Sequence, residues 1–182
     1  MRVPQALRRW CSDRLIRRAM KTPYFHLDGY MERYWLVPYA FQPDGIEGAG
    51  CGPVSFWHRP IAWMLQRFGI AIRIHRIMRS DRSDAFHDHP WSYLTVLLIG
   101  AYCEVRPVFK DGMYKHNAVR ICIAGDALLR RADSWHRLVL FDNESCWTLF
   151  ITGPKRQSWG FLEHLHAKTY WRDYVAKHPE RQ

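Results

Sequence analysis

The spacing of apolar residues changes along this chain, from about four positions near the start to two positions after residue 70. In the first segment, 5–21, one set of apolar residues recurs every four positions: Leu7, Cys11, Leu15 and Ala19. Arginines occupy much of the opposite face, so the pattern predicts an amphipathic helix. A short second helix is predicted from Pro60, because proline suits the first turn of a helix and Gly69 suits a C-terminal cap.

The rest of the chain reads as short strands separated by turn residues. A strand is predicted over 30–38, ending at Pro38, and a loop over 42–53, which is rich in glycine and proline. From Ile70 the apolar residues alternate with others, which is the period of a strand. Further strands are predicted over 91–106, 118–123, 127–131, 136–141 and 146–152. Turns are predicted at 110–112, 124–126, 142–144 and 153–154, and a last helix over 167–177.

Several short strands at close spacing favour a sandwich or a barrel. No linker separates two halves of the chain. We therefore predict one structural domain, in which 1–69 form a helical and strand extension packed on a barrel of 70–166. Residues 167–182 would add a C-terminal helix.

Composition and charge exclude some classes of protein. No apolar run approaches the ~20 residues that span a bilayer, and arginines interrupt the apolar stretches of the N-terminal segment, unlike a signal peptide. We therefore expect no membrane span and a cytoplasmic location. The five cysteines are odd in number and show no CxxC spacing, which argues against a disulfide framework or a zinc–thiolate site.

The chain is basic, with a formal net charge of +10. Such a charge suits nucleic acid, a membrane surface or an anionic small molecule as a partner, and selects none of them. We interpret the arginine-rich face of 5–21 as solvated, since most charge runs are. A nucleic-acid contact is the weaker alternative.

The strongest chemical signal is a pair of histidines, His87 and His89, in the segment Phe86-His87-Asp88-His89-Pro90-Trp91. Side chains two positions apart on an extended segment project to the same side. Their imidazoles can then reach one metal ion at ~2.0–2.2 Å. The best candidate for a third ligand is His136, which opens another predicted strand.

The spacing after these histidines resembles motif one of the cupin superfamily. That motif runs His-x-His, three or four residues, Glu, six residues and Gly. In this chain His89 is followed by three residues, Tyr93, six more residues and Gly100. The spacing fits, but a tyrosine stands where the glutamate ligand is expected.

A later stretch of the chain resembles motif two of the same family. That motif runs Gly, five residues, Pro, one residue, Gly, two residues and His. Gly125 and His136 keep that spacing, whereas Arg131 and Asp133 replace the Pro and the second Gly. A bacterial and phage group of cupins also shares three further segments, which appear here as His87–Trp91, Gly100–Glu104 and Thr152–Pro154 with Trp159–Phe161.

The resemblance, which covers about 70–152 closely, implies a mainly β protein. Its fold would be a cupin-type antiparallel β-barrel, also called a jelly roll or double-stranded β-helix, with N-terminal helices and a C-terminal helix. It also implies one divalent metal ion held by His87, His89 and His136. Without the glutamate, the site resembles the three-histidine iron sites of thiol dioxygenases and diketone-cleaving cupins. Fe(II) is therefore preferred, with Zn, Ni, Mn or Cu as alternatives.

The implied activity is that of an Fe(II)-dependent dioxygenase acting on a small polar or anionic substrate. Cupins host many unrelated functions, so two alternatives stay open. One is a non-catalytic module that binds a sugar, a nucleotide or a protein partner. The other is a metal-dependent isomerase, epimerase or hydrolase.

Other residues are assigned roles around the metal. Tyr93 is a fourth ligand, a hydrogen-bond donor or a pocket wall, with the wall preferred, and Glu104 is the second catalytic candidate. Partners for the ligand imidazoles are sought among Glu104, Asp133 and Asp88, of which Asp88 is the least suited to enter the barrel. The substrate-pocket candidates are His75, Arg106 and Arg130.

The strand after the histidine pair is predicted to have an apolar outer face, which another element must cover. Leu94, Val96 and Leu98 alternate with the inward positions, so they would form a second apolar surface. Either a second copy of the chain, giving a homodimer, or the terminal helices would cover it.

Overall fold

The computed structural model describes residues 4–24, 26–37, 58–81, 84–142 and 144–178. Its helices are α1 (Gln5–Ala19), α2 (Arg59–Arg67) and α3 (Trp171–Lys177). The strands are β1 (Met31–Val37), β2 (Ala71–Ile77), β3 (Phe86–His87), β4 (Trp91–Ile99), β5 (Ala101–Lys110), β6 (Met113–Ile123), β7 (Ala127–Arg130), β8 (Arg137–Leu140), β9 (Cys146–Lys155), β10 (Gly160–Glu163) and β11 (Ala167–Tyr170). The loop predicted over 42–53 lies outside the described residues.

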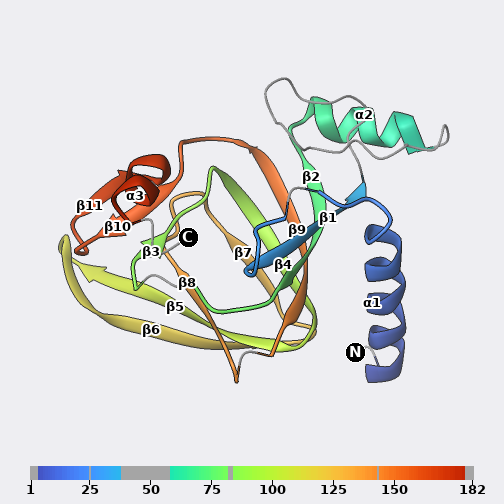
Figure 1. Ribbon diagram of the computed structural model, residues 1–182, viewed down its shortest axis with the longest axis horizontal. Coiled ribbons are helices and arrows are strands. Elements are labelled where there is room, and N and C mark those ends of the chain that lie inside the picture. The colour runs from blue at the N-terminus through green and yellow to red at the C-terminus, as the bar shows by residue number, and fades with distance from the viewer. Residues whose placement is uncertain (1–3, 25, 38–57, 82–83, 143, 179–182) are drawn as a thin grey trace.

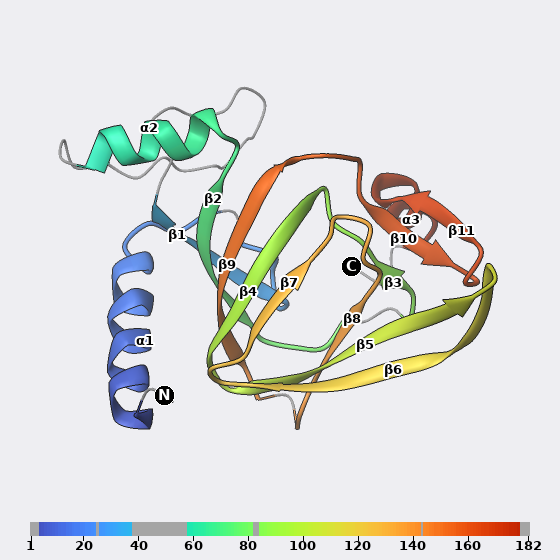
Figure 2. The ribbon, with the colours of Figure 1, turned by 180° about the vertical axis from the view of Figure 1, so that it is seen from behind.

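The strands form three separately hydrogen-bonded antiparallel sheets. The largest has the order β1-β2-β9-β4-β7, and the second has the order β6-β5-β8. The third, β11-β10-β3, lies with α3 at the opposite end of the molecule from α1 (Figure 1). The long β5–β6 hairpin is well seen from behind (Figure 2).

A core of apolar side chains fills the space between the two larger sheets. It includes Ile77 of β2, Leu97 of β4, Tyr102 of β5, Leu138 of β8 and Cys146 of β9, all less than a tenth exposed. Because these residues come from both sheets, burial of their apolar surface holds the sheets face to face. These apolar side chains occupy only part of the interior, and polar residues occupy one end of it.

Helix α1 lies along the outer face of the five-stranded sheet (Figure 1). Ile16 and Ala19 are buried there together with Leu98, so this helix covers at least part of the outer face of β4. Leu7, by contrast, is half exposed. The predicted stripe was therefore wrong at its start, because residues four apart drift by about 40° per step on a helix of 3.6 residues per turn. None of the described helices is long and apolar enough to cross a membrane.

The run predicted as one strand over 91–106 is two strands in different sheets. Gly100 separates them with φ of +84°, a left-handed conformation that favours glycine. A Cβ at this position would lie 2.9 Å from Cβ of Cys146. The motif-one glycine therefore sends β5 into the facing sheet, a change that the apolar pattern could not show.

Two further predictions were wrong in detail. Gly153 and Pro154 were expected to form a turn but lie inside β9, where a shift in pairing register with β4 between Trp91 and Tyr93 accommodates them. The last helix begins at Trp171 rather than at 167. Residues 167–170 instead pair with β10, which satisfies their backbone hydrogen bonds in a sheet.

Candidate metal centre

Three histidines from two segments of the chain meet at one end of the interior. His87 ends β3, His89 lies in the extended segment that follows, and His136 immediately precedes β8. The backbones of His87 and His136 exchange two hydrogen bonds, of 2.9 and 3.0 Å. One ring nitrogen from each of the three residues lies within 4.8 Å of the other two. The structure thus brings together the three ligands predicted from the motif spacing.

These imidazoles have the chemistry that a divalent ion requires. Nε2 of His89 lies 2.8 Å from Nε2 of His136, so the nitrogens face one another. Burial lowers the pKa of His87 to about 4, with a smaller opposing effect from Asp81. Burial also lowers the pKa of His89 well below its ordinary value, and the neighbouring histidines lower it further. Both rings are therefore neutral at pH 7, which leaves a lone pair on each for a metal.

The buried carboxylate of Glu104 lies beside the outer nitrogen of one candidate ligand. Its Oε1 lies 3.3 Å from Nδ1 of His136, and its side chain is only 2% exposed. The guanidinium of Arg130 donates to the same carboxylate, from Nε at 2.9 Å and also from Nη2. Burial alone would raise the pKa of Glu104, but the hydrogen bonds from His136 and Arg130 outweigh it and lower the pKa to about 2. Glu104 is therefore an anion, and Arg130 is engaged with it rather than facing a substrate pocket.

Asp81 occupies the corresponding position beside His87, and the sequence did not point to it. Its Oδ2 lies 3.7 Å from Nδ1 of His87 and accepts a 2.7 Å hydrogen bond from the backbone N–H of Leu138. The hydroxyl of Tyr30 donates to Oδ1 at 2.5 Å. Asp81 lies in a polar segment without periodicity, so only its closeness to His87 in the chain was a signal.

Tyr93 points its hydroxyl at the candidate ligands. The oxygen lies 3.3 Å from Nε2 of His136, and the ring packs edge-on to His89 at 4.5 Å between centroids. Burial raises the pKa of Tyr93, so the phenol keeps its proton at neutral pH. The side chain therefore packs against the candidate ligands and places an O–H group beside their ring nitrogens.

Two of the pocket candidates face the interior. His75 is buried on β2 and stacks on Phe150 at 4.7 Å between ring centroids. Arg106 lies on the same face of β5 as Glu104, two residues away, and its charge acts to lower the pKa of Tyr93. Nε2 of His75 and Nε of Arg106 are both buried with no hydrogen-bond partner among the described residues. Each is thus a nitrogen left for a partner that the described chain does not supply.

The two remaining carboxylate candidates do not approach the imidazoles. Asp133 pairs with Arg131, and both side chains are more than half exposed. Asp88 is buried but turns away from the histidines toward the C-terminal segment. This agrees with the expectation that an extended chain directs Asp88 opposite to its two histidine neighbours.

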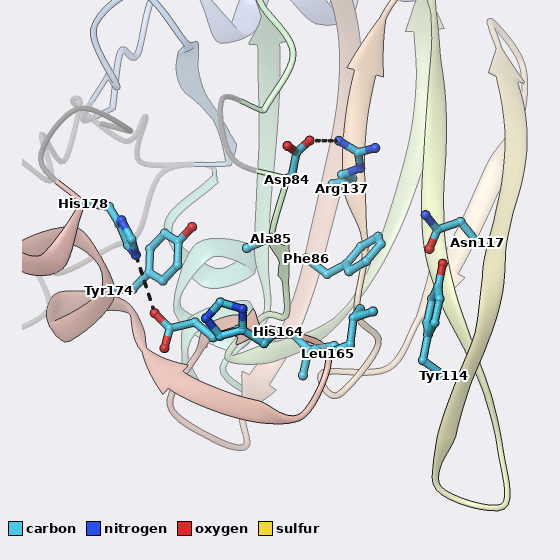
Figure 3. A pocket seen from close by; sticks show the side chains of 12 residues that line it. Asp84, Ala85, Phe86, Tyr114, Asn117, Arg137, His164, Leu165, Tyr174 and His178 are labelled. Carbon is cyan, nitrogen blue, oxygen red and sulfur yellow. Dashed lines mark hydrogen bonds and ion pairs between the residues drawn. The ribbon is translucent and has the colours of Figure 1, made fainter.

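A cavity of about 440 Å³ lies on the other side of the ligand-bearing strands. Its lining includes Phe86 and Arg137, which are the neighbours of His87 and His136 in the chain. Because successive side chains of a strand point to opposite faces, this cavity and the histidine cluster do not share a wall side chain. Figure 3 shows Arg137 bonded to Asp84 beside this cavity. His178, which also lines it, lies 3.7 Å from the carboxylate of Glu163.

Comparison with known proteins identifies the fold. No protein-family model and no curated protein matches the chain. Among solved structures, the vicilin of hazelnut (Corylus avellana) aligns with 78% of this chain and 34% of its own, at 11% identity and a TM-score of 0.50. A vicilin from Capsicum annuum aligns with 87% of this chain and 38% of its own, at 12% identity and a TM-score of 0.50.

The chain spans less than two fifths of the length of either vicilin, so the likeness concerns the fold alone. Vicilins are cupins. The helices at both ends, the antiparallel sheets and the histidine cluster between them agree with the arrangement expected from the two sequence motifs. This chain therefore has the cupin fold, as its motif spacing predicts.

Proposed function

We propose that this protein binds one divalent metal ion through His87, His89 and His136 and acts as an Fe(II)-dependent dioxygenase on a small anionic molecule. The observation that carries the proposal is the convergence of three imidazole nitrogens, one from each histidine, within 4.8 Å. Imidazole nitrogen suits iron, zinc, copper and nickel. Three protein ligands also leave positions open on the ion, as catalytic rather than structural sites do.

The donor set supports iron over a purely structural ion. Among the described residues, the cluster contains three nitrogens and no carboxylate, so a bound ion would keep its full charge. Such an ion would supply a redox-active Lewis acid with open coordination positions. The three-histidine set also resembles the iron sites of thiol dioxygenases.

The chain's own residues would then hold the ligands and the substrate. The Glu104 carboxylate lies 3.3 Å from Nδ1 of His136, which favours the ring orientation that leaves Nε2 for the metal. Asp81 has the same relation to His87 at a longer distance. The Tyr93 hydroxyl can donate to a negatively charged atom beside the ligating nitrogens.

An anionic substrate is favoured by the interior nitrogens. The guanidinium of Arg106 is a fork of donors that matches a carboxylate, and its buried Nε has no partner among the described residues. His75 offers a second buried nitrogen in the same interior. An anion bound beside Arg106 would compensate its charge, whereas a neutral apolar molecule would leave that charge uncompensated.

Metal analysis of untagged protein tests the first half of the proposal. Purified without oxygen and loaded with Fe(II), the wild type should hold one iron per chain, and His136→Ala should hold none. His166→Ala, which changes an exposed histidine outside the cluster, should behave like the wild type. Equal metal content in His136→Ala and the wild type would refute the proposed ligand set.

Oxygen consumption with a panel of small carboxylates tests the second half. We expect turnover that requires iron. We also expect slower turnover in Arg106→Met, through a higher KM. Activity with zinc that iron cannot replace would instead indicate an isomerase or hydrolase. A folded, metal-loaded protein without turnover on any substrate would favour the non-catalytic module.

A further inference from the structure

The carboxylate between the two ligand histidines is bound by the C-terminal segment. Asp88 is only 1% exposed. Its Oδ1 accepts a 2.8 Å hydrogen bond from the backbone N–H of Gly160, and its Oδ2 accepts from Lys168 Nζ at 2.5 Å and from Gln157 Nε2 at 2.8 Å. A carboxylate buried this deeply is stable only with such donors. All three come from residues 157–168, far from Asp88 in the chain.

Gln157 joins both histidine motifs with a single amide group. Besides Asp88, its Nε2 lies 3.0 Å from the carbonyl oxygen of His89 and 3.0 Å from that of Ala132. Ala132 belongs to motif two, four residues before His136. The amide therefore lies where the segments that carry His89 and His136 meet.

Gly160 allows the segment to approach Asp88 this closely. A Cβ at this position would collide with the backbone carbonyl of Thr169 on β11. With glycine, β10 and β11 pair tightly, and the Gly160 N–H reaches the carboxylate while Lys168 reaches it from β11. This close approach is a physical reason for the glycine in the Trp159-Gly160-Phe161 segment.

The His89 end of the pair needs this support because regular strand pairing ends at His87. β3 is only two residues long and ends at His87, and His89 lies outside the strands. The backbone of His89 is held by one hydrogen bond, of 3.1 Å from its N–H to the carbonyl of Ala132, and by Gln157. The distance between the two imidazoles therefore depends on contacts made around Asp88.

We infer that Gln157, Gly160 and Lys168 form a clip on Asp88 that holds the His87–His89 backbone and so sets the affinity of the metal centre. These are positioning residues, because none of them touches a ligating imidazole. The clip itself rests on the contacts above, and only its effect on affinity rests on the proposed metal-binding function.

The first arm of the test needs no metal. Hydrogen exchange is measured by mass spectrometry on metal-free Lys168→Met, Gln157→Ala and wild type. Both variants should exchange the amides of 86–89 at least about tenfold faster than the wild type. Lys177→Met is the matched control, since Lys177 pairs with Glu163 at 3.8 Å in the same part of the chain and does not contact Asp88. Unchanged protection of the 86–89 amides in both clip variants would overturn the inference.

The second arm titrates Co(II) into the same proteins and follows its visible absorption. Affinity in Lys168→Met and Gln157→Ala should fall about tenfold, the size typical for groups that orient metal ligands, with no loss in Lys177→Met. Affinity within twofold of the wild type despite faster exchange would overturn the effect on the metal. A wild type that binds no Co(II) would refute the proposed function, while the exchange data would still decide the clip.

Discussion

Oε1 of Glu104 lies 3.3 Å from Nδ1 of His136, on the side of the ring away from the Nε2 atom that faces His89. A carboxylate in this position fixes both the tautomer and the orientation of the imidazole. We therefore expect the metal affinity of the centre to depend on Glu104, and its stability to depend on the charge of Arg130.

Glu104→Gln should lower metal affinity by about 10- to 100-fold while the three ligands remain. The amide keeps the shape of the side chain but removes the negative charge that favours a donating Nδ1–H. Competition with a chromophoric chelator measures the change. Glu163→Gln, which alters a carboxylate with no contact to the cluster, should leave the affinity unchanged.

Arg130→Met should destabilise the protein by about 3–5 kcal/mol at pH 7, because it leaves the Glu104 anion buried with one partner fewer. The two side chains are 13% and 2% exposed, so water cannot replace the lost donor. Urea unfolding provides the measurement. The double variant Glu104→Gln/Arg130→Met should be more stable than Arg130→Met alone, and additive losses would contradict the pairing.

Tyr93→Phe should retain the metal but bind anions more weakly. The change keeps the packing against His89 and removes only the hydroxyl 3.3 Å from Nε2 of His136. Azide titrated into the Co(II)-loaded protein should bind about 2- to 10-fold less tightly, the value of one hydrogen bond. Identical azide affinity would mean that Tyr93 is a wall and nothing more.

The metal-free protein should lose stability as the pH falls from 6.5 to 4. In this window the unfolded chain protonates His87, whereas in the folded state its pKa is about 4, so the unfolded state binds more protons. One such group contributes a slope of up to about 1.4 kcal/mol per pH unit. His87→Asn should flatten the unfolding free energy against pH, and the exposed His166→Asn should not.

Gly100→Ala should cost more stability than Gly112→Ala, although both glycines have positive φ. A Cβ at Gly112 meets nothing within 4 Å, so the cost there is the backbone strain of about 1–2 kcal/mol. At Gly100 the Cβ would also press on Cys146, which adds about 1–3 kcal/mol of overpacking. Equal losses in urea unfolding would contradict the proposed crowding.

Local sequence patterns were sufficient to predict elements whose contacts are local and residues that lie at a strict motif spacing. The starts of α2 near Pro60 and of β2 near Ile70, and the antiparallel mainly-β class, follow from residues that lie near each other in the chain. That His87, His89 and His136 lie together was predictable only because the motif spacing is tied to a known fold, in which the two motifs meet. The alternation of apolar and polar residues alone predicted one continuous strand through Gly100, where the structure has two.

By itself, the sequence determined the candidate ligands: three histidines at motif spacing, with Tyr93 where a carboxylate ligand is expected. Only the tertiary structure decided their surroundings. It placed Asp81 beside His87, engaged Arg130 with Glu104 and turned Asp88 to the C-terminal segment. The physical reason is that spacing along a strand specifies which face a side chain takes, whereas hydrogen-bond partners come from distant segments that meet only after the sheets pack.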